Sequence, residues 1–278
     1  MVNKFNYSVI IPFRNSIDQL RTALRSIPDR SDIQVITIDN SKELFKEEEY
    51  PKFKNAHLTI TSSKFGAGAG CARNVGLKKV VGDWLLFLDA DDFFTKNAFE
   101  AFDRYLYKHY DIVFFKADSI SLTTGERSER HKGINKIIDN FLLSKDEDDL
   151  RYQFSYPVCK MIRSSLILDN EIKFEEIKCA NDTMFSVKSG HLASSITADN
   201  SSVYVITESP KGGSLTTDKS SENSFIRFQV ALRRYAYLKT IGKGYLKPHY
   251  YSYILNALFS FGPKEAFRYL SYYYHYKG

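Results

Sequence analysis

Three carboxylates within four positions are the residues of this sequence best placed to do chemistry. Asp89, Asp91 and Asp92 directly follow an apolar run, Leu85–Leu88, which opens after a glycine at position 82. A short apolar run of this kind predicts a buried strand of a parallel sheet, and open α/β sheets bind ligands beyond the carboxyl ends of such strands. Because crowded carboxylates repel one another, the cluster suits a divalent cation, which proteins hold with one or two carboxylates plus substrate phosphates. A solvated acidic turn is the alternative.

Strand-like and helix-like runs alternate on both sides of this cluster. Apolar runs typical of strands lie at 8–12, 33–38, 57–61, 111–115 and 204–207. Helical patterns at 20–27, at about 71–80 and at 98–107 separate some of them, which predicts a parallel α/β sheet. The glycine-rich stretch 66–70 is neither a Walker loop nor a dinucleotide fingerprint, and by itself it favours a flexible loop. The polar segment 119–138 leaves a hairpin and a mobile loop as alternatives.

The bulk composition limits the class of protein. With 278 residues, 43% of them apolar and 26% charged, the sequence predicts one large globular domain or a domain with an appendage. The net charge of +6 favours an anionic partner. Cys71, Cys159 and Cys179 lack metal-ligand spacing and fit a reducing compartment. Since no apolar run is long enough to span a bilayer, we expect a cytoplasmic protein, with attachment to the inner face of a membrane left open.

Four motifs occur in order along the first third of the chain. A first strand ends in an Ile-Pro pair and a polar turn (9–15), a second ends in Asp-Asn-Ser (39–41), an Ala-Arg-Asn-x-Gly segment occupies 72–76, and Gly-Asp, an apolar strand and Asp-x-Asp follow at 82–92. Together they resemble the inverting family 2 glycosyltransferases, and the resemblance covers about residues 7–215. It implies the GT-A fold: an α/β fold whose mostly parallel, Rossmann-like nucleotide-binding sheet is flanked by helices.

The resemblance also implies a domain organisation. Residues 1–220 would form the GT-A catalytic domain, with a nucleotide-sugar-binding half at 1–118 and an acceptor-binding half at 119–220. A C-terminal helical extension would occupy 221–278.

The same resemblance assigns roles at the donor site. Asp39 would accept a hydrogen bond from the nucleobase, Asp89 would reach the ribose, and Asp91 would hold Mn²⁺ or Mg²⁺ on the diphosphate, with Asp89 as the second metal-site residue. A metal there stabilises the charge that the leaving diphosphate gains. The full donor-binding set is Pro12, Phe13, Arg14, Asn15, Asp39, Ser41, Gly68, Arg73, Asp89, Ala90, Asp91 and Lys211.

A catalytic base is expected in the second half. Family members carry Glu-Asp before an apolar helix, with the Asp as base; here Asp182 takes that position and Asn181 departs from the usual Glu. Asn181 would be a good N-cap, and the helix dipole would then favour an ionised Asp182. The spacing alone would favour an ordinary first-turn carboxylate, and the upstream motifs favour the base. Lys160, by analogy with a family segment, and Asn181 are the acceptor-side candidates.

The chain ends in a helical, aromatic and basic region. Tyrosine and phenylalanine recur every few residues between positions 245 and 276, interleaved with lysine and arginine. Such helices can pack on the catalytic domain or on a second subunit, and they can also lie in a membrane interface. Both alternatives stay open, as does an oligomer.

The resemblance implies an inverting enzyme of surface polysaccharide biosynthesis. It would move a hexose or N-acetylhexosamine from a UDP-sugar to the hydroxyl of a saccharide or lipid-linked acceptor. A non-catalytic relative that only binds nucleotide sugar and a sugar nucleotidyltransferase are the alternatives, although the nucleotidyltransferase's basic glycine-rich loop is absent. The aromatic residues carry no RNA-binding signature, so we expect no nucleic-acid partner.

Overall fold

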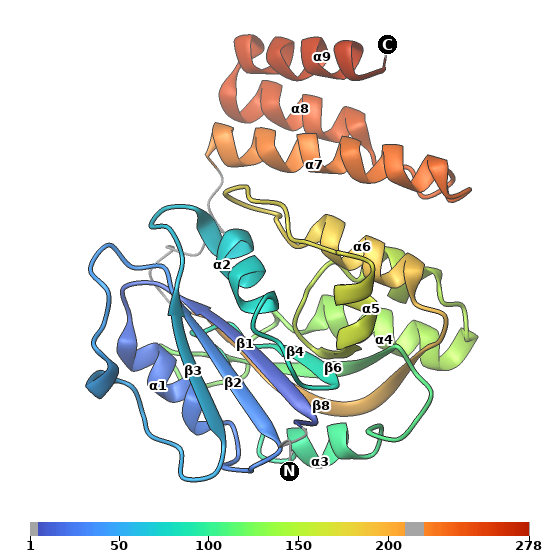
Figure 1. The fold of residues 1–278 in the computed structure, drawn as a ribbon. Helices are drawn as coiled ribbons and strands as arrows, with labels where there is room; N and C mark the ends of the chain where they lie inside the picture. The colour runs from blue at the N-terminus through green and yellow to red at the C-terminus, as the bar shows by residue number, and fades with distance from the viewer. Residues whose placement is uncertain (1–4, 209–219, 278) are drawn as a thin grey trace.

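A computed structural model describes residues 5–208 and 220–277. Its centre is an eight-stranded sheet flanked by helices, and three further helices form a layer beside it (Figure 1). The strands are β1 (Tyr7–Phe13), β2 (Ile33–Asp39), β3 (His57–Ser62), β4 (Trp84–Phe87), β5 (Phe93–Phe94), β6 (Ile112–Ser121), β7 (Lys160–Arg163) and β8 (Ile196–Glu208). The α-helices are α1 (Ile17–Arg25), α2 (Gly68–Leu77), α3 (Ala98–Asp103), α4 (Lys132–Ser144), α5 (Ser164–Asp169), α6 (Thr183–Leu192), α7 (Ser221–Thr240), α8 (Tyr250–Phe261) and α9 (Pro263–Lys277). A 3-10 turn, η1 (Glu47–Glu49), and a π-helical turn, η2 (Asp149–Gln153), complete the described elements.

The strand order places the ends of three motif-bearing strands at one edge. The order is β3-β2-β1-β4-β7-β6-β8-β5, and the first four strands run parallel. β7 is antiparallel to β4 and to β6, whereas β6 and β8 are parallel and β5 pairs antiparallel with β8. Because β1, β2 and β4 run the same way, their carboxyl ends and the polar residues that follow meet at the same edge of the sheet.

The strands that form this edge are buried, and Gly76 lets helix α2 pack closely against them. β1, β2 and β4 are buried along almost their whole length, as expected for parallel strands covered on both faces. α2 packs closely on them: a Cβ at Gly76 would lie 2.9 Å from Ile10 Cγ2 and 3.0 Å from Ile38 Cδ1. A larger residue at this position would lift α2, and with it Arg73, away from the sheet.

Some local expectations were wrong. The glycine-rich stretch is not wholly a loop, because α2 begins at Gly68, and Gly66 and Gly68 have φ values of +77° and +84° that favour glycine. α3 ends at Asp103, four residues before the expected end. In the first part of the polar segment, β6 continues to Ser121 and Ile120 forms an antiparallel bridge with Arg127, as in the hairpin alternative. From Lys132 onward the segment belongs to α4, a helix that neither alternative included.

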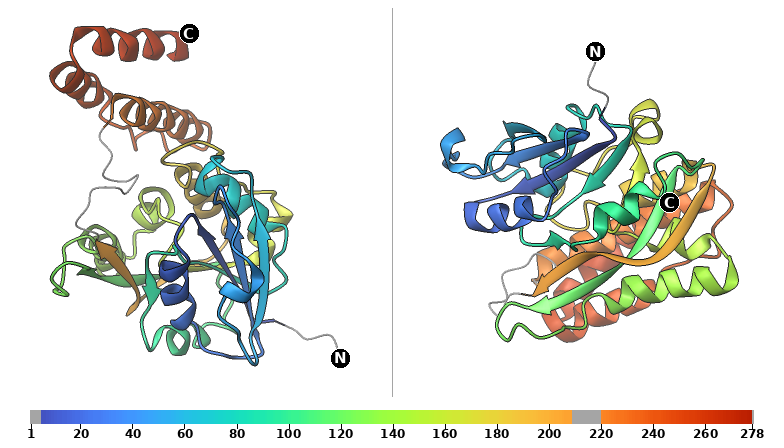
Figure 2. Two further views of the ribbon diagram at one scale, coloured as in Figure 1. Left: turned by 90° about the vertical axis from the view of Figure 1, so that its left-hand side faces the viewer. Right: turned by 90° about the horizontal axis from the view of Figure 1, so that it is seen from below.

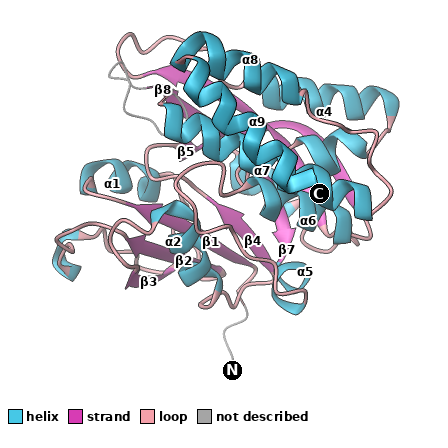
Figure 3. Cartoon of the chain, turned by 90° about the horizontal axis from the view of Figure 1, so that it is seen from above, coloured by secondary structure: helices cyan, strands magenta, loops and turns pink. Residues whose placement is uncertain are grey.

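The C-terminal helices have a core of their own and one helix that docks on the rest of the chain. The core consists of Phe225, Phe228, Leu232, Tyr250, Ala257 and Tyr269. A second cluster joins Leu238 of α7 to Tyr152 of η2 and Val187 of α6. Figure 2 shows the three helices as a layer at one end of the molecule, and Figure 3 shows them over the part that contains α4 and α6. The expected packing is thus present, while the boundary at residue 220 stays a proposal.

None of the helices among residues 5–208 and 220–277 is both long enough and apolar enough to cross a membrane.

Candidate active site

The turn after β2 forms one wall of a pocket at the carboxyl edge. Asp39 is 2% exposed, and its carboxylate accepts hydrogen bonds from the backbone N–H groups of Ser41 (2.8 Å) and Phe45 (2.9 Å). Asn15, at φ 58°, donates its backbone N–H to Ser41 Oγ at 2.7 Å. These contacts tie the turn after β1 to the turn after β2. Asp39 therefore holds the turn that forms the predicted nucleobase site.

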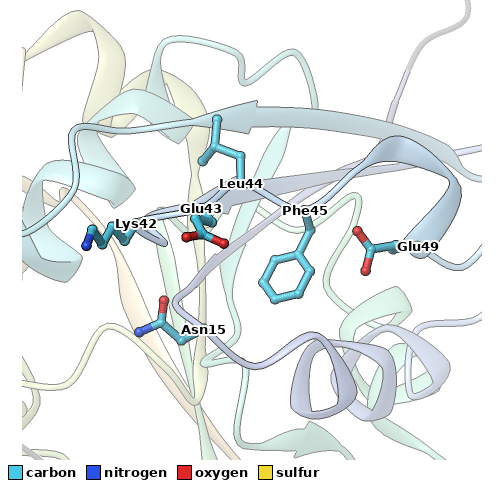
Figure 4. A pocket seen from close by; sticks show the side chains of 6 residues that line it. All are labelled: Asn15, Lys42, Glu43, Leu44, Phe45 and Glu49. Carbon is cyan, nitrogen blue, oxygen red and sulfur yellow. The ribbon is translucent and has the colours of Figure 1, made fainter.

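The pocket at these turns has a volume of about 420 Å³. Its lining consists of Asn15, Lys42, Glu43, Leu44, Phe45 and Glu49 (Figure 4). Of these, only Asn15 was predicted. The others were missed because a charge-rich segment is typical of ordinary surface. Phe45, one aromatic residue within that charged run, is the signal that could have identified the wall.

The neighbouring predicted residues divide into buried and accessible ones. Phe13 is 5% exposed and packs between Phe45 and Tyr50, with ring centroids 5.8 and 5.9 Å away. Pro12 is half-buried and Arg14 is exposed. Phe13 thus supports the pocket wall by packing against Phe45. The Arg14 side chain reaches solvent.

Asn40 attaches the glycine-rich stretch to this edge. Its Nδ2 donates to the Gly68 carbonyl oxygen at 3.2 Å, and its Oδ1 accepts from the Gly66 N–H at 3.2 Å. On the other side of α2, a Cβ at Gly70 would lie only 2.3 Å from the Glu175 carbonyl oxygen. The glycines therefore allow α2 to approach a segment that lies more than 100 positions later in the chain.

Arg73 connects the donor side of the site to the predicted base. Its Nη2 lies 2.6 Å from Asp89 Oδ1, and its Nη1 donates to Asn181 Oδ1 at 3.1 Å. The guanidinium carbon lies 5.3 Å from the centre of the Phe174 ring. Arg73 is 6% exposed. Residues 73, 89 and 181, which the sequence predicted separately, are thus in one hydrogen-bonded group.

The acidic turn is fixed by the end of β8. Asp92 is buried, and its carboxylate accepts from Tyr204 Oη (2.9 Å) and from the Thr207 backbone N–H (2.7 Å). Burial, followed by the charges of Asp91 and Asp89, raises the pKa of Asp92 well above its usual range. Thr207 Oγ1 also donates to the Asp91 carbonyl oxygen at 2.7 Å. Asp92, which the sequence analysis included only in the carboxylate cluster, therefore holds the turn in shape.

Asp91 is the carboxylate that remains available to a metal. Asp89 pairs with Arg73 and Asp92 is bound by β8, whereas the Asp91 carboxylate forms no ion pair with any residue that the structure describes. Burial of the carboxyl group, then the Asp89 charge, raises the pKa of Asp91, although its side chain still reaches solvent. Across residues 5–208 and 220–277, no cluster of three or more His, Cys, Asp or Glu side chains is arranged to hold a metal. The donor set fits an ion that takes one carboxylate from the protein and its other oxygens from substrate phosphates.

Asp182 lies directly before α6, with Asn181 turned toward Arg73. The helix begins at Thr183, so Asp182, not Asn181, occupies the N-cap position, and its side chain forms no capping hydrogen bond. The expected capping role of Asn181 was wrong because its Oδ1 is used by Arg73. Burial raises the pKa of Asp182, opposed chiefly by the Arg73 charge. A raised pKa suits a carboxylate that must accept a proton near neutral pH.

Lys160 is placed inside the protein. It is 3% exposed, and its Nζ donates to Ser186 Oγ at 3.3 Å and lies 5.0 Å from the centre of the Phe154 ring. Burial lowers the pKa of Lys160 to about 7. Its contact with an acceptor therefore stays a prediction. Lys211 lies outside the described residues.

Arg130 is a cation at the site that sequence reasoning missed. It is exposed, its Nη1 donates to the Thr207 carbonyl oxygen at 2.8 Å, and its charge lowers the pKa of Asp91. It belongs to the polar segment before α4, where no periodic pattern marked it. Its position beside the acidic turn makes it a second candidate, after Arg73, for contact with an anionic substrate.

Sequence comparison finds poly(ribitol-phosphate) glycosyltransferases among the similar proteins. The chain is 25% identical over 228 residues to the poly(ribitol-phosphate) beta-N-acetylglucosaminyltransferase TarS of Staphylococcus aureus strain Mu50, which covers 79% of this chain and 38% of TarS. It is 26% identical over 255 residues to the corresponding enzyme TarP of S. aureus strain N315, covering 87% of this chain and 75% of TarP. The chain thus spans well under half the length of TarS.

Structural comparison finds the same architecture in solved proteins. A crystal structure of S. aureus TarS 1-349 in complex with UDP-GlcNAc matches with a TM-score of 0.66 and 23% identity, over 84% of this chain and 66% of that one. The fold is therefore the GT-A fold. The family model "Glycosyl transferase family 2" matches residues 8–169, more than half of the chain. All of β1 but its first residue, the Arg73 segment and the acidic turn fall inside that match, and the protein belongs to glycosyl transferase family 2.

Proposed function

We propose that this protein is an inverting glycosyltransferase of surface polysaccharide biosynthesis. It would transfer a hexose or N-acetylhexosamine from a UDP-sugar to the hydroxyl of a saccharide or lipid-linked acceptor. The observation that carries the proposal is the Arg73 bridge: Arg73 contacts both Asp89, proposed for the donor side, and Asn181, the neighbour of the proposed base Asp182. The names of TarS and TarP support an acceptor built of polyol phosphate, and the UDP-GlcNAc complex of TarS supports a UDP-sugar donor.

The donor would lie along the carboxyl edge of the sheet. The nucleobase would enter the pocket beside Asn15 and Phe45, and the turn held by Asp39 would face it. The diphosphate would lie near Asp91 and Arg130. The residues present fit Mn²⁺ or Mg²⁺ held by Asp91, and such an ion supplies Lewis-acid stabilisation of the departing diphosphate. Arg73, paired with Asp89, would keep that carboxylate oriented toward the ribose.

The reaction would be a single displacement. Asp182 accepts the proton of the acceptor hydroxyl while the oxygen attacks the anomeric carbon, and the bond from that carbon to the diphosphate oxygen breaks with its electron pair leaving on the diphosphate. Attack from the face opposite the leaving group inverts the configuration. Burial raises the pKa of Asp182 and so increases its proton affinity, while the Arg73 charge opposes that rise.

The exposed apolar surface of α8 supports a further proposal, contact with a membrane. α8 carries no charged residue and exposes Tyr251 (74%), Leu255 (51%) and Phe259 (83%). We propose a cytoplasmic enzyme that rests on the inner membrane face through this surface, near a lipid-linked acceptor. Sedimentation with anionic vesicles, compared with zwitterionic ones, tests the contact. Concentration-dependent self-association without vesicle binding would instead assign the surface to an oligomer.

The test of the donor site is thermal-shift binding of UDP-GlcNAc, UDP-glucose and GDP-mannose, each with Mn²⁺ and with EDTA. A ligand that binds only the folded state raises the melting temperature. A metal-dependent shift with a UDP-sugar, together with UDP release, supports the proposal. Donor binding without any UDP release would favour the non-catalytic alternative. That alternative arises because Asn181 replaces the glutamate that is usual in the family. No shift with any nucleotide sugar would refute the donor site.

A further inference from the structure

The residues just before the base form a segment that α2 holds on one side. We call residues 174–182 the base segment. Asn74 of α2 accepts the Phe174 backbone N–H at 2.9 Å and donates to the Phe174 carbonyl oxygen at 3.0 Å. Within the segment, the Glu175 N–H donates to the Asn181 carbonyl oxygen at 3.1 Å. The start of the base segment is thus hydrogen-bonded directly to the residue that precedes Asp182.

α7 of the C-terminal extension holds the same segment from the other side. Arg233 Nε lies 2.8 Å from Glu175 Oε1, and Arg233 Nη2 lies 3.2 Å from Glu175 Oε2. This two-point contact fixes the orientation of both side chains, which are 32% and 24% exposed. Further along, Cys179 Sγ contacts the Asn223 carbonyl oxygen of α7 at 3.5 Å, and both residues are buried.

α7 has anchors of its own that do not involve the base segment. Arg234 Nη2 donates to the Tyr152 carbonyl oxygen at 2.7 Å, and Lys243, just after the helix, lies 2.7 Å from Asp148. Leu238 is fully buried against Tyr152 and Val187. Because η2 and α6 fix the helix independently, α7 can serve as a rigid support for the base segment.

We propose that α7 is a positioning element of the active site, and that the Arg233–Glu175 ion pair sets the placement of Asp182 through the base segment. The catalytic unit would then extend beyond the domain that the family motifs define. The proposal rests on the proposed function for the role of Asp182 as base. Small displacements of a reacting group have large kinetic effects, whereas a partly exposed ion pair adds little to stability. A positioning role therefore predicts a large effect on turnover and a small one on unfolding.

The experiment compares two arginines of the same helix in the full chain. Arg233→Met removes the contact with Glu175, and Arg234→Met, the matched control, removes a contact with η2. For each protein we would measure the melting temperature, hydrogen exchange of the Phe174 and Glu175 amides, and the kcat and KM of UDP release from UDP-GlcNAc. Arg233→Met is expected to lower kcat by about 10- to 100-fold with little change in KM. Its two amides should exchange roughly fivefold faster.

The control and a charge exchange decide between positioning and general stability. Arg234→Met should leave both amides protected and kcat near the wild-type value. The double variant Glu175→Arg with Arg233→Glu should recover much of the lost turnover, because the pair is restored with reversed charges. Equal losses in both single variants, or unchanged exchange of the two amides in Arg233→Met, would overturn the proposal. If the wild-type chain releases no UDP, the proposed function fails, and the exchange measurement still decides whether α7 holds the base segment.

Discussion

Arg73 Nη1 lies 3.1 Å from Oδ1 of Asn181, while the other terminal nitrogen of the same guanidinium contacts Asp89. One buried cation therefore has a carboxylate on its donor side and a neutral amide on its base side. Where the resemblance implies a glutamate, this chain places no second negative charge on Arg73 next to Asp182, and the Arg73 charge is the main influence that lowers the pKa of Asp182.

Replacing Asn181 with glutamate should move the acid limb of the pH–rate profile. The added carboxylate would pair with Arg73 and place a negative charge beside Asp182, so the pKa of Asp182 rises. The base must be ionised to act. As the pH is lowered, activity should therefore begin to fall at a higher pH than in the wild type, and the acid limb should be displaced by about one pH unit. Asn181→Gln, which stays neutral, is the control. An unmoved limb in Asn181→Glu would contradict the assignment of Asp182.

Asp182→Asn should separate binding from chemistry. Removal of a general base typically costs about 10²- to 10⁴-fold in rate, while the donor contacts lie elsewhere in the site. UDP release should therefore collapse, and the thermal shift with UDP-sugar and Mn²⁺ should persist. Retention of wild-type turnover would show that another group takes the proton.

Asp91→Asn should remove the metal-dependent part of donor binding. The Asp91 side chain makes no ion pair among the described residues, so the fold should tolerate the change. The difference between thermal shifts measured with Mn²⁺ and with EDTA should disappear. If the difference remains, the metal is held by other ligands.

Gly70→Ala should destabilise the protein and disturb the base segment. The new Cβ would lie 2.3 Å from the Glu175 carbonyl oxygen, and overpacking of this kind costs about 1–3 kcal/mol. The control is Gly133→Ala in α4, where an added Cβ meets nothing within 4 Å. Urea unfolding of both variants measures the difference, and only Gly70→Ala should also lower turnover.

Lys160→Met should change how stability depends on pH. Burial lowers the pKa of Lys160 from 10.5 to about 7, so between these values the unfolded chain binds more protons than the folded one. Stability of the wild type therefore rises with pH in this window, and Lys160 is most unfavourable at pH 7 and below. The methionine variant should be more stable than the wild type near pH 7, and the gap should close toward pH 10.5. A constant gap across urea titrations would show that the Lys160 charge is not the cause.

Local patterns were enough to predict the donor half of the fold. The apolar runs of β1, β2 and β4 are buried on both faces, and short apolar runs that end in polar turns are typical of such strands. The rule that parallel strands end together then placed Asp39 and Asp89 at one edge. Arg73, which lies on α2, was placed there only by the family resemblance.

Contacts between distant segments could not be predicted in the same way. The partner of Asn181 is 108 positions away, and the capping role expected from its local sequence was wrong because Arg73 uses its side chain. Arg233 lies 58 positions from Glu175, and nothing in the helical pattern of α7 marks it among the other basic residues.

The hydroxyl group of Tyr204 accepts the Asp89 N–H at 3.1 Å and donates to Asp92 at 2.9 Å, so one phenol joins both ends of the acidic turn. The hydrogen bonds from β8 to the turn reach the Asp92 side chain and the Asp91 backbone oxygen, and among the described residues none of them uses the Asp91 side chain. If residue 91 holds the proposed metal, it could exchange one oxygen ligand for another during divergence while the loop keeps its form. The metal preference of the proposed site could then evolve independently of the scaffold that presents it.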